Sequence, residues 1–281
     1  MVNDNSILNK IFTQNGMKAW LDNKESAFYK EFVESFGSKY VGKENREIIG
    51  DIYKYLNKYY RNEYFYKNTL LNKLLLGKHS LNTTTAITEI PINKSKADFI
   101  LINGKAVVYE IKTGLDSFER LESQIEDYFK AFVNVYVVTC EENYEKLKSI
   151  LNNDNVGIYI LTDRNTLSKK REAKDYYSKL DYKAMFDILR KNEFENILLE
   201  HYGELPNTTQ FKYYDECFKL FKNIEKKLAY RYMFLELKKR VKVNKENFNK
   251  FIPYELRFLV YFSNLKKQDY LKLNKFLNNK Y

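Results

Sequence analysis

Two carboxylates and a lysine interrupt an otherwise apolar stretch in the middle of the chain. Asp98 is followed by Glu110 and then, two residues later, by Lys112. Residues two apart on a strand project from the same face, so Glu110 and Lys112 are expected to point the same way. Charges among residues that bury need a charged partner or a metal ion. The pattern therefore predicts a metal site built from acidic side chains.

The ligand types predict a hard divalent cation, Mg²⁺ or Mn²⁺. Asp98 and Glu110, with the carbonyl of Ile111, would bind it through oxygen atoms. Glu89 on the preceding strand is either a third carboxylate or a solvated edge residue. Such a cation lowers the pKa of a water molecule and screens the charge of a phosphate, and Lys112 would position that water or stabilise the developing charge. This chemistry is that of phosphodiester hydrolysis.

The turn between the two strands decides whether the carboxylates meet. Strands are expected over residues 97–102 and 106–111, joined across Asn103-Gly104. A two-residue turn would place Asp98 opposite Tyr109, pointing away from Glu110. A three-residue loop over residues 102–104, with Gly104 in the left-handed conformation, would pair Asp98 with Val108 and bring the carboxylates to one face. The metal-site hypothesis therefore predicts this bulged turn or another kink.

The elements around this hairpin alternate between strands and helices. Residues 83–90 are β-branched and alternating, with Pro91 as the expected end, and residues 133–139 and 156–161 are apolar enough for buried strands. A helix is expected to start at Asp116 with Glu119 as its capping-box partner, and a shorter one before residue 156. The order predicts an α/β fold with a mixed sheet flanked by helices.

The ends of the chain have a helical pattern. We expect three regions: a helical N-terminal region, 1–80, that stops at a glycine cap, Gly77; a core, 81–165; and a helical C-terminal region, 166–281. Their net charges are +4, −4 and +11. An acidic middle between basic ends fits a metal site in a nucleic-acid-binding protein. The alternative is that lysine-rich helices are only solvated faces.

Some basic residues are candidates for contacts with nucleic acid. Lys238, Lys239 and Arg240 form a basic run that would either contact phosphate or end a solvated helix. The C-terminal helices as a whole could bind nucleic acid, form a homo-oligomer or bind a partner protein.

The spacing of Asp98, Glu110 and Lys112 on two adjacent strands resembles the PD-(D/E)XK nuclease superfamily. Gln124 and Tyr128, four residues apart and so on one helical face, match the Q-x-x-x-Y motif of its RecB-like branch, and the surrounding run is similar to small bacterial and phage members. The resemblance covers residues 80–165 and implies a restriction-endonuclease-like core. It also implies that Gln124 and Tyr128 orient the active site or the substrate backbone.

The resemblance has two departures and one further candidate. Ala97 stands where the superfamily's name has proline, and no glutamate lies late in the helix before the first strand, where Glu47 and Glu63 are the available alternatives. Arg120, one turn before Gln124, would either contact nucleic acid or pair with a nearby carboxylate.

Two functions follow from these observations. The first is a Mg²⁺-dependent nuclease acting on DNA, in phage, mobile-element or defence biology. The second is a non-catalytic nucleic-acid-binding or regulatory protein on the same fold. Two separated cysteines without a C-x-x-C pair argue against structural zinc and for reduced thiols in the cytoplasm. The polar start and the lack of a long apolar run predict neither a signal peptide nor a membrane span.

Overall fold

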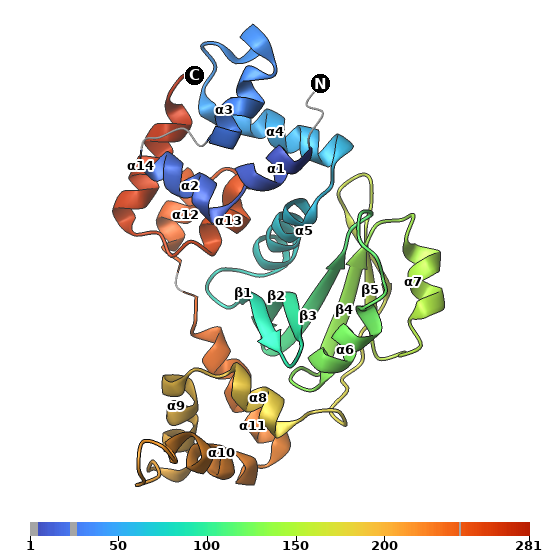
Figure 1. Cartoon of the computed structure of the whole chain (residues 1–281), viewed down its shortest axis with the longest axis vertical. Helices are drawn as coiled ribbons and strands as arrows, with labels where there is room; N and C mark the ends of the chain where they lie inside the picture. Colours follow the sequence, from blue (N-terminus) through green and yellow to red (C-terminus); the bar gives the residue numbers. More distant parts are fainter. Residues whose placement is uncertain (1–4, 23–26, 242) are drawn as a thin grey trace. The chain divides into compact units, whose positions relative to one another are not determined.

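The computed structural model describes residues 5–22, 27–241 and 243–281. Within these ranges the fold is α/β, as predicted: a six-stranded mixed sheet is accompanied by fourteen α-helices, and both ends of the chain are helical (Figure 1). The chain divides into two compact units. The helical unit comprises residues Met1–Leu81 and Lys242–Tyr281, and the sheet unit comprises Asn82–Val241. Residues 166–281 thus contribute to both units.

The helical unit joins two distant stretches of sequence through buried amides. Asn68, fully buried, donates to the Tyr254 carbonyl at 3.0 Å and accepts from the Phe258 N–H at 2.9 Å. Asn45 likewise donates to the Phe276 carbonyl at 2.9 Å. The helices of this unit are α1 (Asn5–Ile11), α2 (Gln14–Leu21), α3 (Ala27–Glu34), α4 (Asn45–Tyr59), α5 (Glu63–Leu70), α12 (Lys245–Phe251), α13 (Arg257–Tyr261) and α14 (Lys267–Asn278).

The predicted glycine cap at Gly77 is wrong. Helix α5 runs directly into a π-helix, Leu71–Leu76, and Gly77 follows with right-handed helical angles, φ −89° and ψ −37°. A glycine cap needs the left-handed region, so the helix continues through Gly77.

The sheet runs in sequence order from β1 to β6. The β1–β2, β2–β3 and β5–β6 pairs are antiparallel, whereas β3–β4 and β4–β5 are parallel. Pro91 lies inside β1 rather than ending it, which is tolerated because β1 is an edge strand. The strands are β1 (Thr85–Ile92), β2 (Ser95–Asn103), β3 (Lys105–Lys112), β4 (Asn134–Thr139), β5 (Gly157–Leu161) and β6 (Leu167–Arg171).

The predicted register of the β2–β3 hairpin is wrong. Asn103 pairs with Lys105, so Gly104 alone forms the tip, at φ +71°. Leu101 pairs with Val107 rather than with Lys105. The strand is displaced by two residues from the predicted register, and a shift of two keeps every side chain on its face.

Helix α6 (Leu121–Phe129) begins later than predicted. Asp116 does not cap it. Its carboxylate instead accepts hydrogen bonds from the backbone N–H and the hydroxyl of Thr113, both at 2.8 Å. The loop between β3 and α6 is therefore stabilised by hydrogen bonds between its own residues, Thr113 and Asp116.

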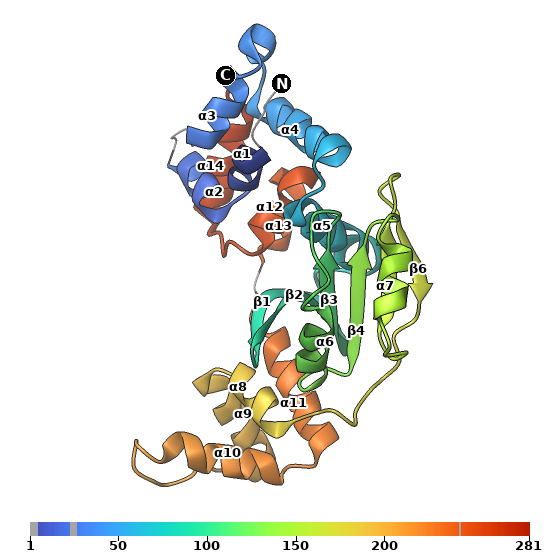
Figure 2. The same cartoon turned by 45° about the vertical axis from the view of Figure 1, so that its right-hand side comes forward.

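Helix α6 packs on the sheet against β2 and β4 (Figures 1 and 2). Its apolar residues share one hydrophobic core with the facing side of the sheet and with the helices that follow. The remaining helices of the sheet unit are α7 (Tyr144–Ile150), α8 (Tyr182–Ile188), α9 (Lys191–Tyr202), α10 (Tyr213–Asn223) and α11 (Lys226–Lys238). In the described ranges, no helix is long and apolar enough to cross a membrane.

Gly157 at the start of β5 is a point where side chains and backbone pass closely. A Cβ atom there would meet the Tyr136 ring and lie 2.8 Å from the Ala173 backbone nitrogen. We expect Gly157→Ala to destabilise the protein by about 1–3 kcal/mol, because the overlap forces backbone shifts in a packed sheet. Chemical denaturation measures this.

Gly50→Ala is the matched control. Gly50 lies within α4, and the nearest atom to its Cβ position is 3.9 Å away. Removing a glycine from a helix interior is expected to stabilise by about 0.5–1 kcal/mol. Equal effects of the two substitutions would contradict the close approach at Gly157.

Candidate active site

Asp98, Glu110 and Lys112 converge at the end of β3. The β2–β3 ladder stops at the Phe99–Tyr109 pair, one step before Asp98 would face Glu110. The Asp98 carboxylate instead accepts the backbone N–H of Ile111 at 2.8 Å. The N–H and C=O of one strand residue point to the same side, so the Ile111 carbonyl points to the β2 side of β3, the side on which Asp98 accepts the N–H. The sharing of one face by the carboxylates thus holds, although the predicted turn does not.

Glu110 is 1% exposed, and both of its carboxylate oxygens have partners. Lys112 Nζ lies 3.1 Å from Oε1, and the Tyr128 hydroxyl donates to Oε2 at 2.6 Å. Burial raises the pKa of Glu110, while Lys112 and hydrogen bonds with Tyr128, Lys112 and Asp98 oppose the rise, and the balance leaves the pKa raised. Burial therefore disfavours the charged form of Glu110 more than its partners favour it, and a cation beside it would lower the pKa.

Helix α6 supplies the groups that hold this pair in place. Gln124 Oε1 accepts a hydrogen bond from Lys112 Nζ at 2.8 Å. The Tyr128 hydroxyl also lies 2.9 Å from the Lys96 carbonyl, so its one proton is shared between that carbonyl and Glu110. Burial, and then the charge of Glu110, raise the pKa of Tyr128 far above its usual value, so it remains a donor. The i, i+4 spacing places both residues on one side of the helix.

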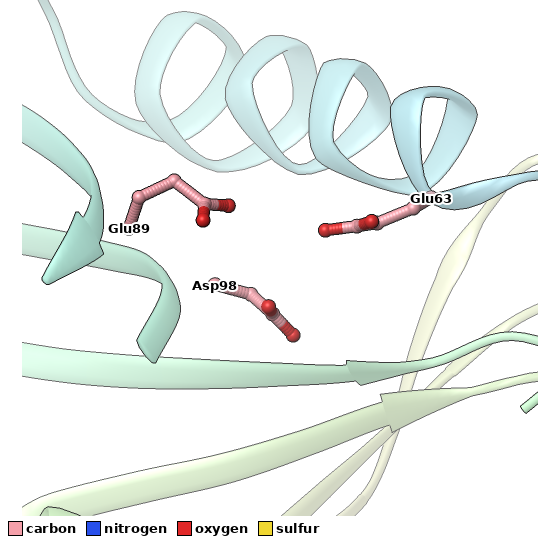
Figure 3. Close-up of side chains that lie close together, drawn as sticks. All are labelled: Glu63, Glu89 and Asp98. Carbon is pink, nitrogen blue, oxygen red and sulfur yellow. The ribbon is translucent and has the colours of Figure 1, made fainter. Parts of the chain in front are cut away.

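Glu89 lies next to Asp98 on the neighbouring strand (Figure 3). A carboxylate oxygen of each lies within 4.8 Å of the other. Neither residue is paired in the β1–β2 ladder, which passes from the Thr88–Phe99 pair to the Ile90–Ala97 pair. Glu89 has φ +59°, a left-handed conformation that costs a non-glycine residue about 1–3 kcal/mol. Its side chain is ion-paired with Lys96 at 2.5 Å.

Lys96 is a site residue that the sequence reasoning missed. Its ammonium holds Glu89 and its carbonyl accepts from Tyr128. The available signal was its position two residues before Asp98 in a strand. Glu47 and Glu63 belong to the helical unit: Glu47 closes the capping box of α4, and Glu63 pairs with Lys67 at 2.6 Å.

The four basic candidates have different surroundings. Arg120 is exposed at the start of α6 and lines a pocket. Lys238 is the last residue of α11, and its carbonyl accepts from the Thr85 hydroxyl at 2.9 Å. Lys239 is ion-paired with Glu236. The Arg240 side chain is 9% exposed, and its guanidinium donates two hydrogen bonds to Glu193, of 2.6 and 2.7 Å, and one to the Ile188 carbonyl at 2.6 Å.

The fold and site define an α/β protein with an acidic site beside a lysine at the end of β3. The chain belongs to a phage protein family: a family model described as bacteriophage P4 protein cII matches residues 57–257, more than half of the chain. No curated protein matches it. A solved structure titled "SPO1766 protein of unknown function from Silicibacter pomeroyi" is similar at 14% identity and a TM-score of 0.29, covering 46% of this chain and 87% of that one.

The Arg240–Glu193 pair is expected to stabilise the sheet unit. Burial raises the pKa of Glu193, but hydrogen bonds from Arg240 and from the Arg190 backbone lower it more, so the pKa lies below its usual value. Arg240→Met would leave a buried carboxylate without its partner and should cost about 3–5 kcal/mol at neutral pH. Denaturant titration measures this, with Arg231→Met, at an exposed position on α11, as the control.

The pH dependence of this loss has a defined sign. A lowered folded-state pKa gives stability that is present above the unfolded pKa, about 4.3 for Glu, and is lost as the pH falls through the folded pKa. The difference between wild type and Arg240→Met should therefore shrink below that range. An Arg240 variant as stable as the Arg231 variant at pH 7 would show that the pair does not hold the fold.

Proposed function

We propose that this protein is a metal-dependent nuclease that hydrolyses phosphodiester bonds of DNA. The observation that carries the proposal is the Asp98–Ile111 hydrogen bond of 2.8 Å, which brings a second carboxylate to the end of β3 beside the buried Glu110–Lys112 pair. Two carboxylates and an ammonium are then neighbours, and the Ile111 carbonyl would add a fourth polar group. Membership of a phage family is consistent with a role in phage biology.

The residues present fit a hard divalent cation. Asp98, Glu110 and the Ile111 carbonyl offer oxygen ligands, which Mg²⁺ and Mn²⁺ prefer. Asp98 uses one carboxylate oxygen on the Ile111 N–H, and carboxylate oxygens have further lone pairs for a cation. Glu89 is near enough to Asp98 to add a ligand. When bound, the cation would lower the pKa of a water molecule and screen the charge of the scissile phosphate.

The chain's own residues have separable roles in this proposal. Lys112 has three N–H donors, of which one contacts Glu110 and one contacts Gln124. The third can donate to a phosphate oxygen or to the attacking water, which stabilises the charge that develops in the transition state. Gln124 fixes the direction of the ammonium, and Tyr128 fixes the Glu110 carboxylate. These two residues are positioning residues.

One observation favours the alternative, a non-catalytic protein that binds nucleic acid or a partner on the same fold. Both Glu110 oxygens are already satisfied, one by Lys112 and one by Tyr128. A site in which the lysine replaces the cation would bind without cleaving. The experiments below separate the two functions.

Removal of the candidate catalytic groups tests the nuclease directly. We expect Asp98→Asn, Glu110→Gln and Lys112→Met each to reduce cleavage of single- or double-stranded DNA at least about 100-fold. The first two remove a charge that would hold the cation, and the third removes the ammonium that would stabilise the developing charge. Cleavage should require Mg²⁺ or Mn²⁺ and stop when a chelator is added. Cleavage of RNA is measured in parallel, to compare the two substrates.

Glu145→Gln, an exposed carboxylate on α7, is the matched control and should cleave like wild type. Activity that survives all three site substitutions would exclude this site. A wild-type protein that binds DNA but never cleaves it, with either metal, would support the non-catalytic alternative.

The positioning role of Tyr128 has a different readout. Tyr128→Phe keeps the buried ring but removes the hydroxyl that holds Glu110. Loss of a group that orients a metal ligand costs about 10- to 100-fold in metal affinity or activity. We expect the Mg²⁺ concentration for half-maximal cleavage to rise within this range, while Tyr144→Phe on α7 leaves it unchanged. An unchanged Mg²⁺ dependence in Tyr128→Phe would show that the hydroxyl only serves packing.

A further inference from the structure

A pocket of about 840 Å³ opens between the β1–β2 turn and helix α6. Its lining has a net charge of +2, from four basic and two acidic residues. They are Lys94, Lys96, Arg120, Lys130, Glu126 and Asp127. The volume is in the range of sites that hold a ligand much larger than one phosphate group. None of the lining residues is aromatic or aliphatic.

Asp127 makes this pocket a fixed feature. Its carboxylate accepts hydrogen bonds from Asn93 at 3.1 Å and Ser95 at 2.8 Å in the turn, and from Lys130 on its own helix at 2.9 Å. Asn93 has φ +53°, which an asparagine tolerates in a tight turn. The turn is therefore attached to α6, and the two walls of the pocket keep their spacing.

The charges of the pocket are not equally available to a ligand. Lys130 forms an ion pair with Asp127, and Lys96 forms one with Glu89. Lys94 and Arg120 are exposed, and within the described part of the chain neither side chain has an ion pair or a hydrogen bond. These two cations are the groups that an anionic ligand would meet first.

Two residues of the pocket lining form hydrogen bonds with residues of the site at the end of β3. Gln124 lines the pocket, and its amide oxygen holds Lys112 Nζ. Lys96 also lines it, and its carbonyl accepts from Tyr128, which holds Glu110. A strand whose scissile phosphate lies at a cation held by Asp98 and Glu110 would therefore place a neighbouring phosphate near this pocket.

We propose that this pocket binds backbone phosphates of the DNA strand, next to the scissile phosphate at the cation that Asp98 and Glu110 would hold. The inference rests on the proposed function. Base recognition on single strands uses aromatic side chains for stacking, and the pocket has none, so contacts here are to the backbone. Phosphate contacts position a strand and carry no sequence information. The pocket thus serves any sequence and a polymer rather than a free nucleotide.

The test measures binding of single-stranded oligonucleotides by the full chain carrying Glu110→Gln, without divalent metal, from 50 to 200 mM salt. Adding Lys94→Gln and Arg120→Gln removes two phosphate contacts. Each contact contributes about 0.7 to the slope of log affinity against log salt on single strands, so the slope should fall by about 1.4. The ratio of the affinity of the Glu110→Gln protein to that of the triple variant should then fall about sevenfold between 50 and 200 mM salt. The loss should be equal for different sequences.

The control removes two exposed cations elsewhere in the sheet unit, Lys222→Gln and Arg231→Gln, and should retain the slope. A third variant, Ser123→Glu, adds a carboxylate to the pocket wall and should weaken binding in the same direction. Thermal unfolding confirms that each variant is folded. If the slope of log affinity against log salt fell as much in the control as in the pocket variant, the proposal would be overturned. So would competition by inorganic phosphate or a mononucleotide as strong as that of the oligonucleotide.

The failure of this inference is distinguishable from the failure of the proposed function. If wild type cleaves DNA and the pocket variants cleave with unchanged KM, the nuclease stands and the pocket assignment is wrong. If the pocket variants lose affinity but wild type cleaves nothing, the pocket assignment stands and the catalytic proposal is wrong. With both correct, the pocket substitutions raise KM and leave kcat unchanged.

Discussion

The buried Glu110 carboxylate is the constraint on which the sheet unit depends. A charge that is 1% exposed among apolar strands is costly unless partners meet it. Those partners come from two elements: Lys112 from the same strand and Tyr128 from α6. The helix must therefore present Tyr128 and Gln124 to the end of β3, which fixes its rotation. Strand β2 pairs with β3 only from Phe99 onward, and the Asp98 side chain, one residue earlier, accepts the Ile111 amide in place of a ladder bond.

Strand periodicity explains why the site could be predicted when the turn could not. The pattern of apolar residues specifies which face a side chain occupies, and a shift of two residues changes no face. The hairpin was predicted with Leu101 opposite Lys105, yet Leu101 pairs with Val107. Asp98 and Glu110 share a face in either register, so the expected convergence does not depend on this difference. A one-residue error would not have been tolerated, since it sends Asp98 to the opposite face.

The elements that the sequence did not reveal are those set by tertiary contacts. Strand β6, Leu167–Arg171, is basic and partly exposed, without the alternation that marks a half-buried strand, because it is an edge that pairs on one side only. The basic run ending in Arg240 predicted a phosphate contact or a solvated end. A buried Glu193, 47 residues earlier, was needed to show that the guanidinium is held inside the protein. No local pattern contains that partner.

The strained conformation of Glu89 connects the acidic site with the basic pocket. Its left-handed φ directs a third carboxylate toward Asp98 at the cost of backbone strain, and Lys96 compensates it. Three carboxylates, Glu89, Asp98 and Glu110, are then matched by two lysines, Lys96 and Lys112, which leaves a deficit of one positive charge. The lining of the adjacent pocket has the opposite sign. A cation on the acidic side and a phosphodiester chain on the basic side would satisfy both imbalances together, since the phosphate that contacts the cation belongs to the same polymer as those in the pocket. In the proposed complex, the acidic site and the basic pocket would therefore act on neighbouring phosphates of one strand.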